Sequence, residues 1–258
     1  IALVGRRPGV AARAVADWVP FVALMVAYDL TRGAADGLGM PLQVRMPIAI
    51  DETLFGTVPT VWLQERLGPF GPDVAWWEVP VSLIYVSHYV VPFALGVWWW
   101  VRDHDRWRWW RDRFVTLTAL GLATYVLLPT APPWMASERG EIGPVERTAA
   151  RGWRPLGLDV ADRVFDLGRA AVNQTAALPS LHAAFAAFVA VALWRRVDPR
   201  IRPLVAAYPV AMGVVLVLTG EHYVADVVLG WVYVAATILL WRRIGPRVET
   251  WRSWWVAA

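Results

Sequence analysis

Six long apolar segments dominate the hydropathy pattern of this chain and constrain its fold most strongly. A helix needs about 20 apolar residues to cross the hydrocarbon core of a bilayer, and each segment reaches or approaches that length. Hydrophobic residues make up 57% and charged residues 18% of the 258 residues, against about 45–50% and about 25% in soluble globular proteins. We therefore predict an all-α integral membrane protein with one domain over residues 1–258, a six-transmembrane-helix bundle with extracytoplasmic interfacial segments. The expected spans are 14–30, 79–101, 114–128, 178–194, 203–219 and 223–241.

The distribution of the 25 basic residues, all of them arginine, predicts the orientation of this bundle. With six spans, the N-terminal arginines and the clusters within 102–113, 195–202 and 242–252 fall on one side, while the first loop on the other side is acidic on balance. The positive-inside rule places the arginine clusters in the cytoplasm. Both termini are therefore predicted to be cytoplasmic, in a multi-pass protein of the plasma membrane. No arginine run belongs to a soluble fold that could present it to DNA or RNA, so no nucleic-acid partner is expected.

Three segments have readings other than a plain span or loop. Arg6, Arg7 and Arg13 precede the first apolar segment as they would in a signal peptide, but Asp17 and Asp29 inside the segment favour a membrane span. The stretch 31–78 mixes apolar and polar residues with several prolines and glycines, which predicts an interfacial or re-entrant segment rather than a seventh span. The other long outer stretch, 129–177, begins PTAPPW, which is read as a rigid turn with an interfacial tryptophan.

Two of the four histidines stand at the start of expected spans. His182 begins the fourth span and His222 the sixth, so both are predicted at the extracytoplasmic side and at the same depth. Asp226 follows His222 by four residues, which places both side chains on one face of a helix. A carboxylate there accepts the Nδ1–H of the imidazole and leaves the other nitrogen free as a nucleophile or base. His222, His182 and Asp226 are therefore the predicted catalytic residues, since an aspartate inside a span is costly and indicates function.

The segment AALPSLHAAF, residues 176–185, predicts an anion site beside the first of these histidines. Pro179 suits the first turn of a helix, where its missing N–H costs nothing. The backbone N–H groups that follow, from Ser180 onward, then point out of the helix end, which favours phosphate binding. The sequence therefore predicts that a phosphate binds next to His182.

These motifs resemble those of a known family. PSLH (179–182) and HYVAD (222–226) resemble the second and third motifs of the type 2 phosphatidic acid phosphatase superfamily. NQTAALPSLHAAF followed by GEHYVADVVLG, together with the upstream YVSHYVVP and PTAPPW, resembles its inositol phosphorylceramide synthase-like branch over about residues 83–230. The resemblance implies a six-helix bundle that moves a phosphoryl group or a phospho-headgroup, such as phosphoinositol, from a lipid substrate. It implies that His222 is the nucleophile, Asp226 its orienting partner and His182 the acid for the leaving oxygen, without a metal or other cofactor.

The sequence departs from the wider superfamily at the cations that hold the phosphate. The first motif of that superfamily carries a lysine, which this chain lacks, and the Ser-Arg pair of the third motif corresponds here to Val215 and Leu216. These departures favour the synthase-like branch over the phosphatases. Arg169, Arg154 and Arg151 in the outer loop are candidate replacements. The predicted phosphate- and substrate-binding set is Ser180, Arg169, His88 and Tyr223.

Several alternatives stay open at this point. A lipid phosphate phosphatase, of the phosphatidic acid or polyprenyl phosphate type, would share the first half-reaction, and the catalytic residues do not reveal whether water or an alcohol enters second. Two histidines at one depth could also ligate haem or a metal, although that reading explains neither Asp226 nor the anion site. A transporter is disfavoured because no polar stripe runs through the full depth of the spans. His88, in the middle of the second span, is either a buried core histidine or a donor in the substrate pocket.

Overall fold

The computed structural model describes residues 8–31, 38–68, 70–71, 73–157 and 173–257, and within these ranges it is helical, without β-strands. The predicted all-α class is therefore confirmed. Thr130 forms isolated β-bridges with Gln43 and with Ala176. The elements are α1 (Pro8–Thr31), α3 (Arg45–Phe55), α4 (Pro59–Leu67), α5 (Glu78–Arg102), α6 (His104–Leu127), α7 (Pro133–Glu138), the 3₁₀ helix η1 (Arg151–Leu156), α9 (Leu181–Leu193), α10 (Arg202–Leu218) and α11 (Val224–Ala257).

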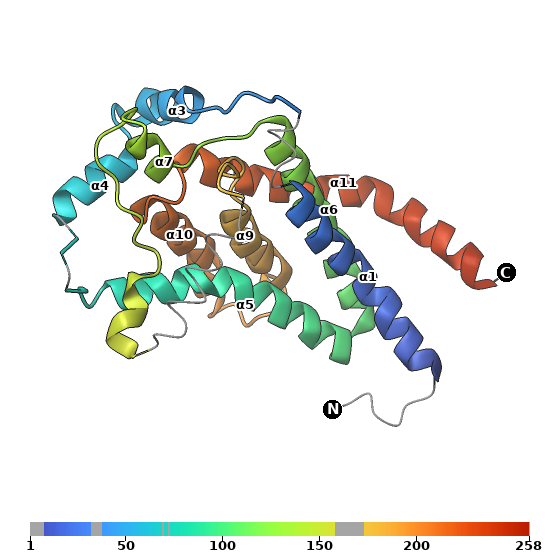
Figure 1. The fold of residues 1–258 in the computed structure, drawn as a ribbon. Helices are drawn as coiled ribbons and strands as arrows, with labels where there is room; N and C mark the ends of the chain where they lie inside the picture. Colours follow the sequence, from blue (N-terminus) through green and yellow to red (C-terminus); the bar gives the residue numbers. More distant parts are fainter. Residues whose placement is uncertain (1–7, 32–37, 69, 72, 158–172, 258) are drawn as a thin grey trace.

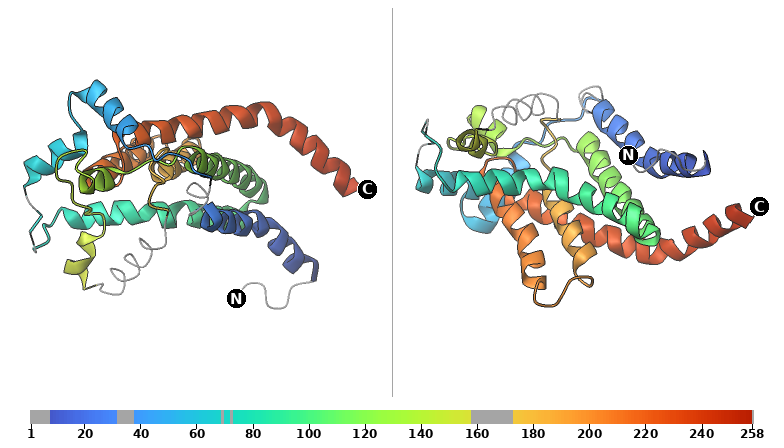
Figure 2. Two further views of the ribbon diagram at one scale, coloured as in Figure 1. Left: turned by 45° about the horizontal axis from the view of Figure 1, so that its top comes forward. Right: turned by 90° about the horizontal axis from the view of Figure 1, so that it is seen from below.

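The long helices surround α9, as Figure 1 shows. Helix α9 contacts α5, α6, α10 and α11, while α1 packs on the outer side of α6. The short helices α3, α4 and α7 gather at one end of the bundle, where α10 ends and α11 begins, and α11 runs from there to the opposite end in both views of Figure 2. This end of the bundle holds the candidate site.

Each of the six predicted apolar segments falls largely on one helix, but not all of these helices have the length of a span. Two of them, Glu78–Arg102 and Val224–Val248, are long and apolar enough to cross a membrane by length and composition. Helix α9 has 13 residues, which give a length of about 20 Å at 1.5 Å per residue. The six-span bundle consequently remains a prediction. Helices α3 and α4, with 11 and 9 residues, are too short for a seventh span.

The arginine-rich stretch 102–113, expected to be a loop, is mostly helical, so this expectation was wrong. Helix α6 begins at His104, ten residues earlier than expected, and Asp103 caps it by accepting the Arg106 N–H at 3.1 Å. Trp107, Trp110 and Phe114 recur on one helix face and are fully buried in the aromatic core of α1, α6 and α9. The arginines between these aromatic residues lower the mean hydropathy of the stretch, which concealed its apolar side.

The short helices are tied to the bundle by hydrogen bonds rather than by apolar packing alone. The Gln64 side chain of α4 donates to the carbonyls of Glu146 and Leu218 at 2.9 and 2.8 Å, and its Oε1 accepts the Glu146 N–H at 2.8 Å. Tyr223 packs into an apolar cluster with Ile48, Val58 and Ala136. Through these contacts the described parts of the two long outer stretches, 31–78 and 129–177, cover the end of α10 and the beginning of α11.

Candidate active site

The structure brings the three predicted catalytic side chains into one hydrogen-bonded chain. Nδ1 of His182 lies 3.1 Å from Nε2 of His222, and Nδ1 of His222 lies 3.3 Å from Oδ2 of Asp226. Asp226 and His222 are buried, at 0% and 3% exposure, while His182 is partly exposed. The two imidazoles come from segments 40 residues apart. No group of three or more acidic or histidine side chains in the described ranges is arranged to hold a metal ion.

Asp226 determines the tautomers of both histidines. An ionised carboxylate only accepts hydrogen bonds, so Nδ1 of His222 carries the proton and Nε2 presents its lone pair. The contact to His182 is then a bond in which Nδ1–H of His182 donates to Nε2 of His222. The same Asp226 oxygen also accepts the backbone N–H of Tyr223 at 2.9 Å. The arrangement therefore offers one nucleophilic nitrogen facing one acidic proton.

His222 lies before its helix, not on it. Helix α11 begins at Val224, and the N–H groups of Glu221 and His222 both donate to the Leu216 carbonyl at the end of α10. Gly220, with a φ of +75°, makes the turn between the two helices. The predicted contact between His222 and Asp226 forms, but the two residues are not one turn apart on a continuous helix. His222 lies in the link before α11, and Asp226 lies in the first turn of α11.

The segment around Ser180 also differs from expectation. Helix α9 begins at Leu181, so Pro179 precedes it, and Ser180 is the N-cap whose Oγ accepts the Ala183 N–H at 3.2 Å. The Ser180 N–H donates to the Asp226 carbonyl at 3.0 Å and is not available to an anion. The first amides of a helix lack intrahelical acceptors, which leaves the N–H groups of Leu181 and His182 for a ligand.

A glycine allows the two motifs to approach each other. A Cβ atom on Gly230 would lie 2.4 Å from the Ser180 carbonyl oxygen, which no side chain could accommodate without moving backbone. Helix α11 therefore packs directly against the beginning of α9. This close approach brings His182 within hydrogen-bond distance of His222.

His88 on α5 adds a third imidazole to the site. Its ring centroid lies 4.0 Å from that of His182, and the side chain is 3% exposed. Nδ1 of His88 donates to the Tyr85 carbonyl, because a carbonyl oxygen only accepts. Nε2 of a neutral His88 is therefore a hydrogen-bond acceptor, and it has no partner in the described part of the chain.

Arg147 is a cation beside the histidines, and the sequence analysis did not predict it. Its Nε and Nη2 donate to the two carboxylate oxygens of Glu221 at 2.8 and 2.9 Å, and its guanidinium lies 4.9 Å from the ring centroid of Trp134. Its charge acts electrostatically on His182. Burial opposes the charge of Arg147, but the hydrogen bonds and the charge of Glu221 outweigh burial and raise its pKa above the usual value. Glu221 next to His222 was the sequence signal for such a partner.

The remaining predicted binding residues lie elsewhere. The side chain of Tyr223 is fully buried in the apolar cluster with Ile48, so it contributes its backbone N–H to the site rather than its hydroxyl. Arg151 forms an ion pair with Glu78, Nε to Oε2 at 2.7 Å. Arg169 and the Arg154 side chain lie outside the described residues.

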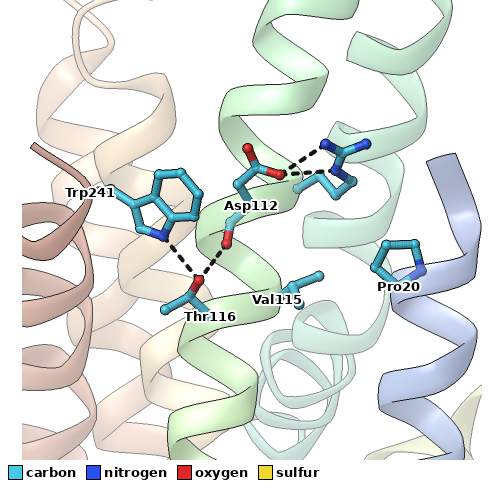
Figure 3. A pocket seen from close by; sticks show the side chains of 6 residues that line it. Pro20, Asp112, Val115, Thr116 and Trp241 are labelled. Atoms are coloured by element: carbon cyan, nitrogen blue, oxygen red, sulfur yellow. Dashed lines mark hydrogen bonds and ion pairs between the residues drawn. The ribbon is translucent and has the colours of Figure 1, made fainter. Parts of the chain in front are cut away.

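A separate cavity of about 290 Å³ opens between α1, α6 and α11 (Figure 3). Trp241 follows Asp226 by 15 residues on α11, about 22 Å along the helix axis, so the cavity lies far from the histidines. The charge of Arg111 is balanced there by Asp112 at 2.9 Å and Asp17 at 3.2 Å. The lining residues are Pro20, Arg111, Asp112, Val115, Thr116 and Trp241.

Comparisons with known proteins agree on one family. The sequence model of the PAP2 superfamily matches residues 56–240 of the chain. The phosphoinositol dihydroceramide synthase of Bacteroides thetaiotaomicron is 27% identical over 227 residues, which cover 82% of this chain and 71% of that protein. No solved structure matches the chain. The region matched by the family model contains all three histidines of the site and Asp226.

Proposed function

Because the chain belongs to the PAP2 superfamily and is an enzyme of that superfamily, as its two histidine motifs predicted, we propose that it transfers a phospho-headgroup between lipids through a phosphohistidine on His222. Family membership and the synthase relative support lipid phosphoryl transfer or phosphatase activity in general. The observation that carries the finer proposal is the hydrogen-bonded chain from His182 through His222 to Asp226.

The first half-reaction uses both imidazoles. Nε2 of His222 attacks the phosphorus of the donor lipid, and the bond from phosphorus to the leaving oxygen breaks. His182, protonated on both ring nitrogens when the anionic phosphate is bound, gives its Nδ1 proton to that oxygen and becomes neutral with the remaining proton on Nε2, so the first product leaves as an alcohol. The phosphoryl group enters between the two nitrogen atoms and replaces the hydrogen bond that joins them in the structure.

The second half-reaction reverses these roles. The acceptor hydroxyl attacks phosphorus and gives its proton to Nδ1 of His182, and the bond between phosphorus and Nε2 of His222 breaks. Asp226 holds the proton on Nδ1 of His222 and stabilises the positive charge of the ring in both steps. Protein groups supply the nucleophile, the acid and the base, so the proposed mechanism needs no metal or other cofactor.

Arg147 and the beginning of α9 are the proposed phosphate site. Two N–H groups of Arg147 bind Glu221, which fixes the guanidinium, and its Nη1 has no partner among the residues described. The amides of Leu181 and His182 belong to the first turn of α9, and the dipole at a helix N-terminus favours an anion. One fixed cation and two amides would stabilise the charge that develops on the phosphoryl oxygens.

The acceptor is proposed to be an alcohol rather than water. The relative at 27% identity is named for phosphoinositol and dihydroceramide, a headgroup and a hydroxyl-bearing lipid. Nε2 of His88, beside His182, is a buried acceptor that could bind such a hydroxyl. An acceptor site that excludes water protects the covalent intermediate from hydrolysis.

The assay that tests this function follows a headgroup-labelled lipid in detergent or vesicles with purified protein. Product formation should be slow with the donor alone and should rise when ceramide-type or other lipid alcohols, or polyols, are added. Equal release of phosphate or headgroup into water with every acceptor tried would identify a lipid phosphate phosphatase instead. Absence of turnover with every phosphate and phosphodiester lipid would refute lipid phosphoryl transfer.

Variants of Arg147 should separate its contribution to catalysis from its contribution to stability. Arg147→Gln leaves Glu221, whose side chain is 5% exposed, without its partner, and should lower the free energy of unfolding by about 3 kcal/mol. The double variant Arg147→Gln/Glu221→Gln should regain most of that stability, because no buried charge remains unpaired. Its kcat/KM should still be about 10²-fold below wild type, because the phosphate loses a fixed donor.

Thermal unfolding and donor kinetics on the two variants and the wild type check this expectation. Arg139→Gln, an exposed arginine near the end of α7, is the matched control. Full activity of the double variant would remove Arg147 from the phosphate site.

The site is further proposed to face the extracytoplasmic side of the plasma membrane, with six spans and both termini in the cytoplasm. Glu138→Cys, exposed at the end of α7, should then react with an impermeant maleimide on intact cells. Asp105→Cys, exposed at the beginning of α6, should react only after the cells are opened. The sequence contains no native cysteine, so the background is low. The reverse labelling pattern would place the site in the cytoplasm.

A further inference from the structure

Asp51 caps a helix that lies far from it in sequence. The side chain is fully buried, and its Oδ2 and Oδ1 accept the backbone N–H groups of Val224 and Ala225, each at 3.0 Å. These two amides are the first of α11, more than 170 residues from Asp51. The preceding amide, of Tyr223, donates to Asp226. Two carboxylates therefore share three successive amides at the beginning of the helix that follows His222.

The cap connects α3 to both histidines. His222 sits in the short link before α11, and its ring is held by Asp226, which belongs to the first turn of that helix. The carbonyl of Asp226 accepts the Ser180 N–H at the beginning of α9, one residue before Leu181 and two before His182. A shift of the beginning of α11 would therefore move Asp226 relative to His222 and also the start of α9.

Burying the Asp51 carboxylate near that of Asp226 costs free energy, which indicates that Asp51 does more than cap the end of a helix. Asp51 and Asp226 are both fully buried, and Oδ1 of Asp226 has no partner among the described residues. Two nearby carboxylates repel each other in a buried site, and a neutral asparagine or serine is an equally good helix cap. A carboxylate retained at this cost indicates that two acceptor oxygens, one for each of the two amides, are needed here.

We propose that Asp51 is a positioning residue for the histidine pair: by holding the first two amides of α11 with its charged carboxylate, it fixes Asp226 and the ring of His222 for attack on phosphorus. The inference rests on the proposed function for its kinetic consequence, although the geometric link between α3 and His222 does not depend on it. No contact between Asp51 and the substrate is required.

The kinetic test compares Asp51→Asn with Glu52→Gln, an exposed carboxylate next to it on α3. An asparagine keeps one acceptor oxygen but turns an NH₂ group toward the second amide, so one of the two bonds is lost. We expect kcat to fall between about 10-fold and about 10²-fold, the range for a small misplacement of reacting groups. KM should stay within about 2-fold of wild type, and Glu52→Gln should behave as wild type. Asp51→Ser, whose hydroxyl still accepts one amide, replaces Asp51→Asn if that variant does not fold.

The pH profile adds a readout that a purely structural cap would not change. Burial raises the pKa of Asp51 to about 6 and the charge of Asp226 adds to this, while the Ala225 and Val224 amides act in the opposite direction. Asp51 is thus charged at pH 7 and takes up a proton as the pH falls through about 6. The ratio of wild-type kcat to Asp51→Asn kcat should therefore shrink below about pH 6. Asp226, in the first turn of α11, and Tyr223, one residue before α11, interact electrostatically with Asp51 and are present in both proteins.

Imidazole NMR tests the link without any substrate. The chain has four histidines, so histidine-selective ¹⁵N labelling gives a small set of signals that single substitutions assign. Asp51→Asn should shift the His222 signals, whereas those of His104, exposed at the beginning of α6, should stay in place. Unchanged His222 signals together with an unchanged kcat would overturn the inference. Wild-type protein inactive on every lipid phosphate would instead refute the proposed function, and the NMR comparison would still decide the role of Asp51.

Discussion

Replacing His222 by glutamine is expected to lower kcat by at least about 10⁵-fold, as for other covalent catalytic groups. Glutamine has a similar size and can still bind Asp226, but it has no nitrogen lone pair that can attack phosphorus. His222 is 3% exposed and its partners are at the junction of α10 and α11, so the fold is expected to tolerate this near-isosteric change. Single-turnover kinetics with labelled donor lipid and thermal unfolding of the same samples measure the two effects separately.

His104→Gln is the matched control, since its side chain is 48% exposed on α6 and lies apart from the site. It should retain wild-type kcat. Retention of more than a few per cent of the activity in a folded His222→Gln variant would exclude His222 as the nucleophile.

Replacing His182 by glutamine is expected to lower kcat by about 10³-fold to 10⁴-fold with a natural donor lipid, because the leaving alkoxide loses its acid. In the same variant, the rate of the first half-reaction should fall far less on a lipid phosphodiester whose leaving group is p-nitrophenol. A nitrophenolate departs without being protonated, so the first half-reaction no longer depends on His182. Burst kinetics, in which nitrophenol is released once per enzyme before the slow second step, would measure this difference.

The comparison with His222→Gln makes the leaving-group experiment decisive. Removal of the nucleophile should abolish activity on both donors, whereas removal of the acid should affect them unequally. Equal losses of the first half-reaction on both donors in His182→Gln would mean that His182 binds or orients the substrate instead of protonating the leaving oxygen.

The histidine pair could be predicted from the sequence because its chemistry is concentrated in two short motifs at helix starts. Alternating spans place the starts of the fourth and sixth helices at the same end of the bundle, and the structure puts His182 and His222 at hydrogen-bond distance. The local geometry could not be predicted in the same way. The sequence pattern placed His222 and Pro179 on helices, whereas the N-cap at Ser180 and the turn at Gly220 begin α9 and α11 later.

The arginine-rich stretch 102–113 shows the limit of mean hydropathy. Five arginines outweigh the tryptophans in any average, but the spacing of Trp107, Trp110 and Phe114 is that of one helix face. Their burial against Phe21 of α1 makes this stretch the beginning of α6 rather than a loop. The periodicity of the large apolar residues was the informative signal.

Arg147 and Asp51 were not predicted because their partners are distant in sequence. Arg147 binds Glu221 across 74 residues, and Asp51 caps Val224 across 173. Both lie in the segments between the predicted spans, where position depends on how short helices pack against the bundle. Neither a periodic pattern nor a motif identifies such residues. From the sequence alone, Arg147 and Asp51 could not be distinguished from the other charged residues of the two outer loops.

The most direct test of the covalent mechanism is to trap the phosphohistidine. Purified wild-type protein is mixed with donor lipid labelled in the transferred headgroup, quenched in alkali within the first turnover, digested and analysed by mass spectrometry. A phosphoramidate is stable in alkali and labile in acid, so we expect an acid-labile headgroup-phosphate adduct on His222. The adduct should form equally well after treatment with a chelator. It should accumulate without acceptor and disappear when acceptor is added. An active protein that never carries label on His222, or activity that is lost on chelation and restored by a metal, would contradict the covalent histidine mechanism.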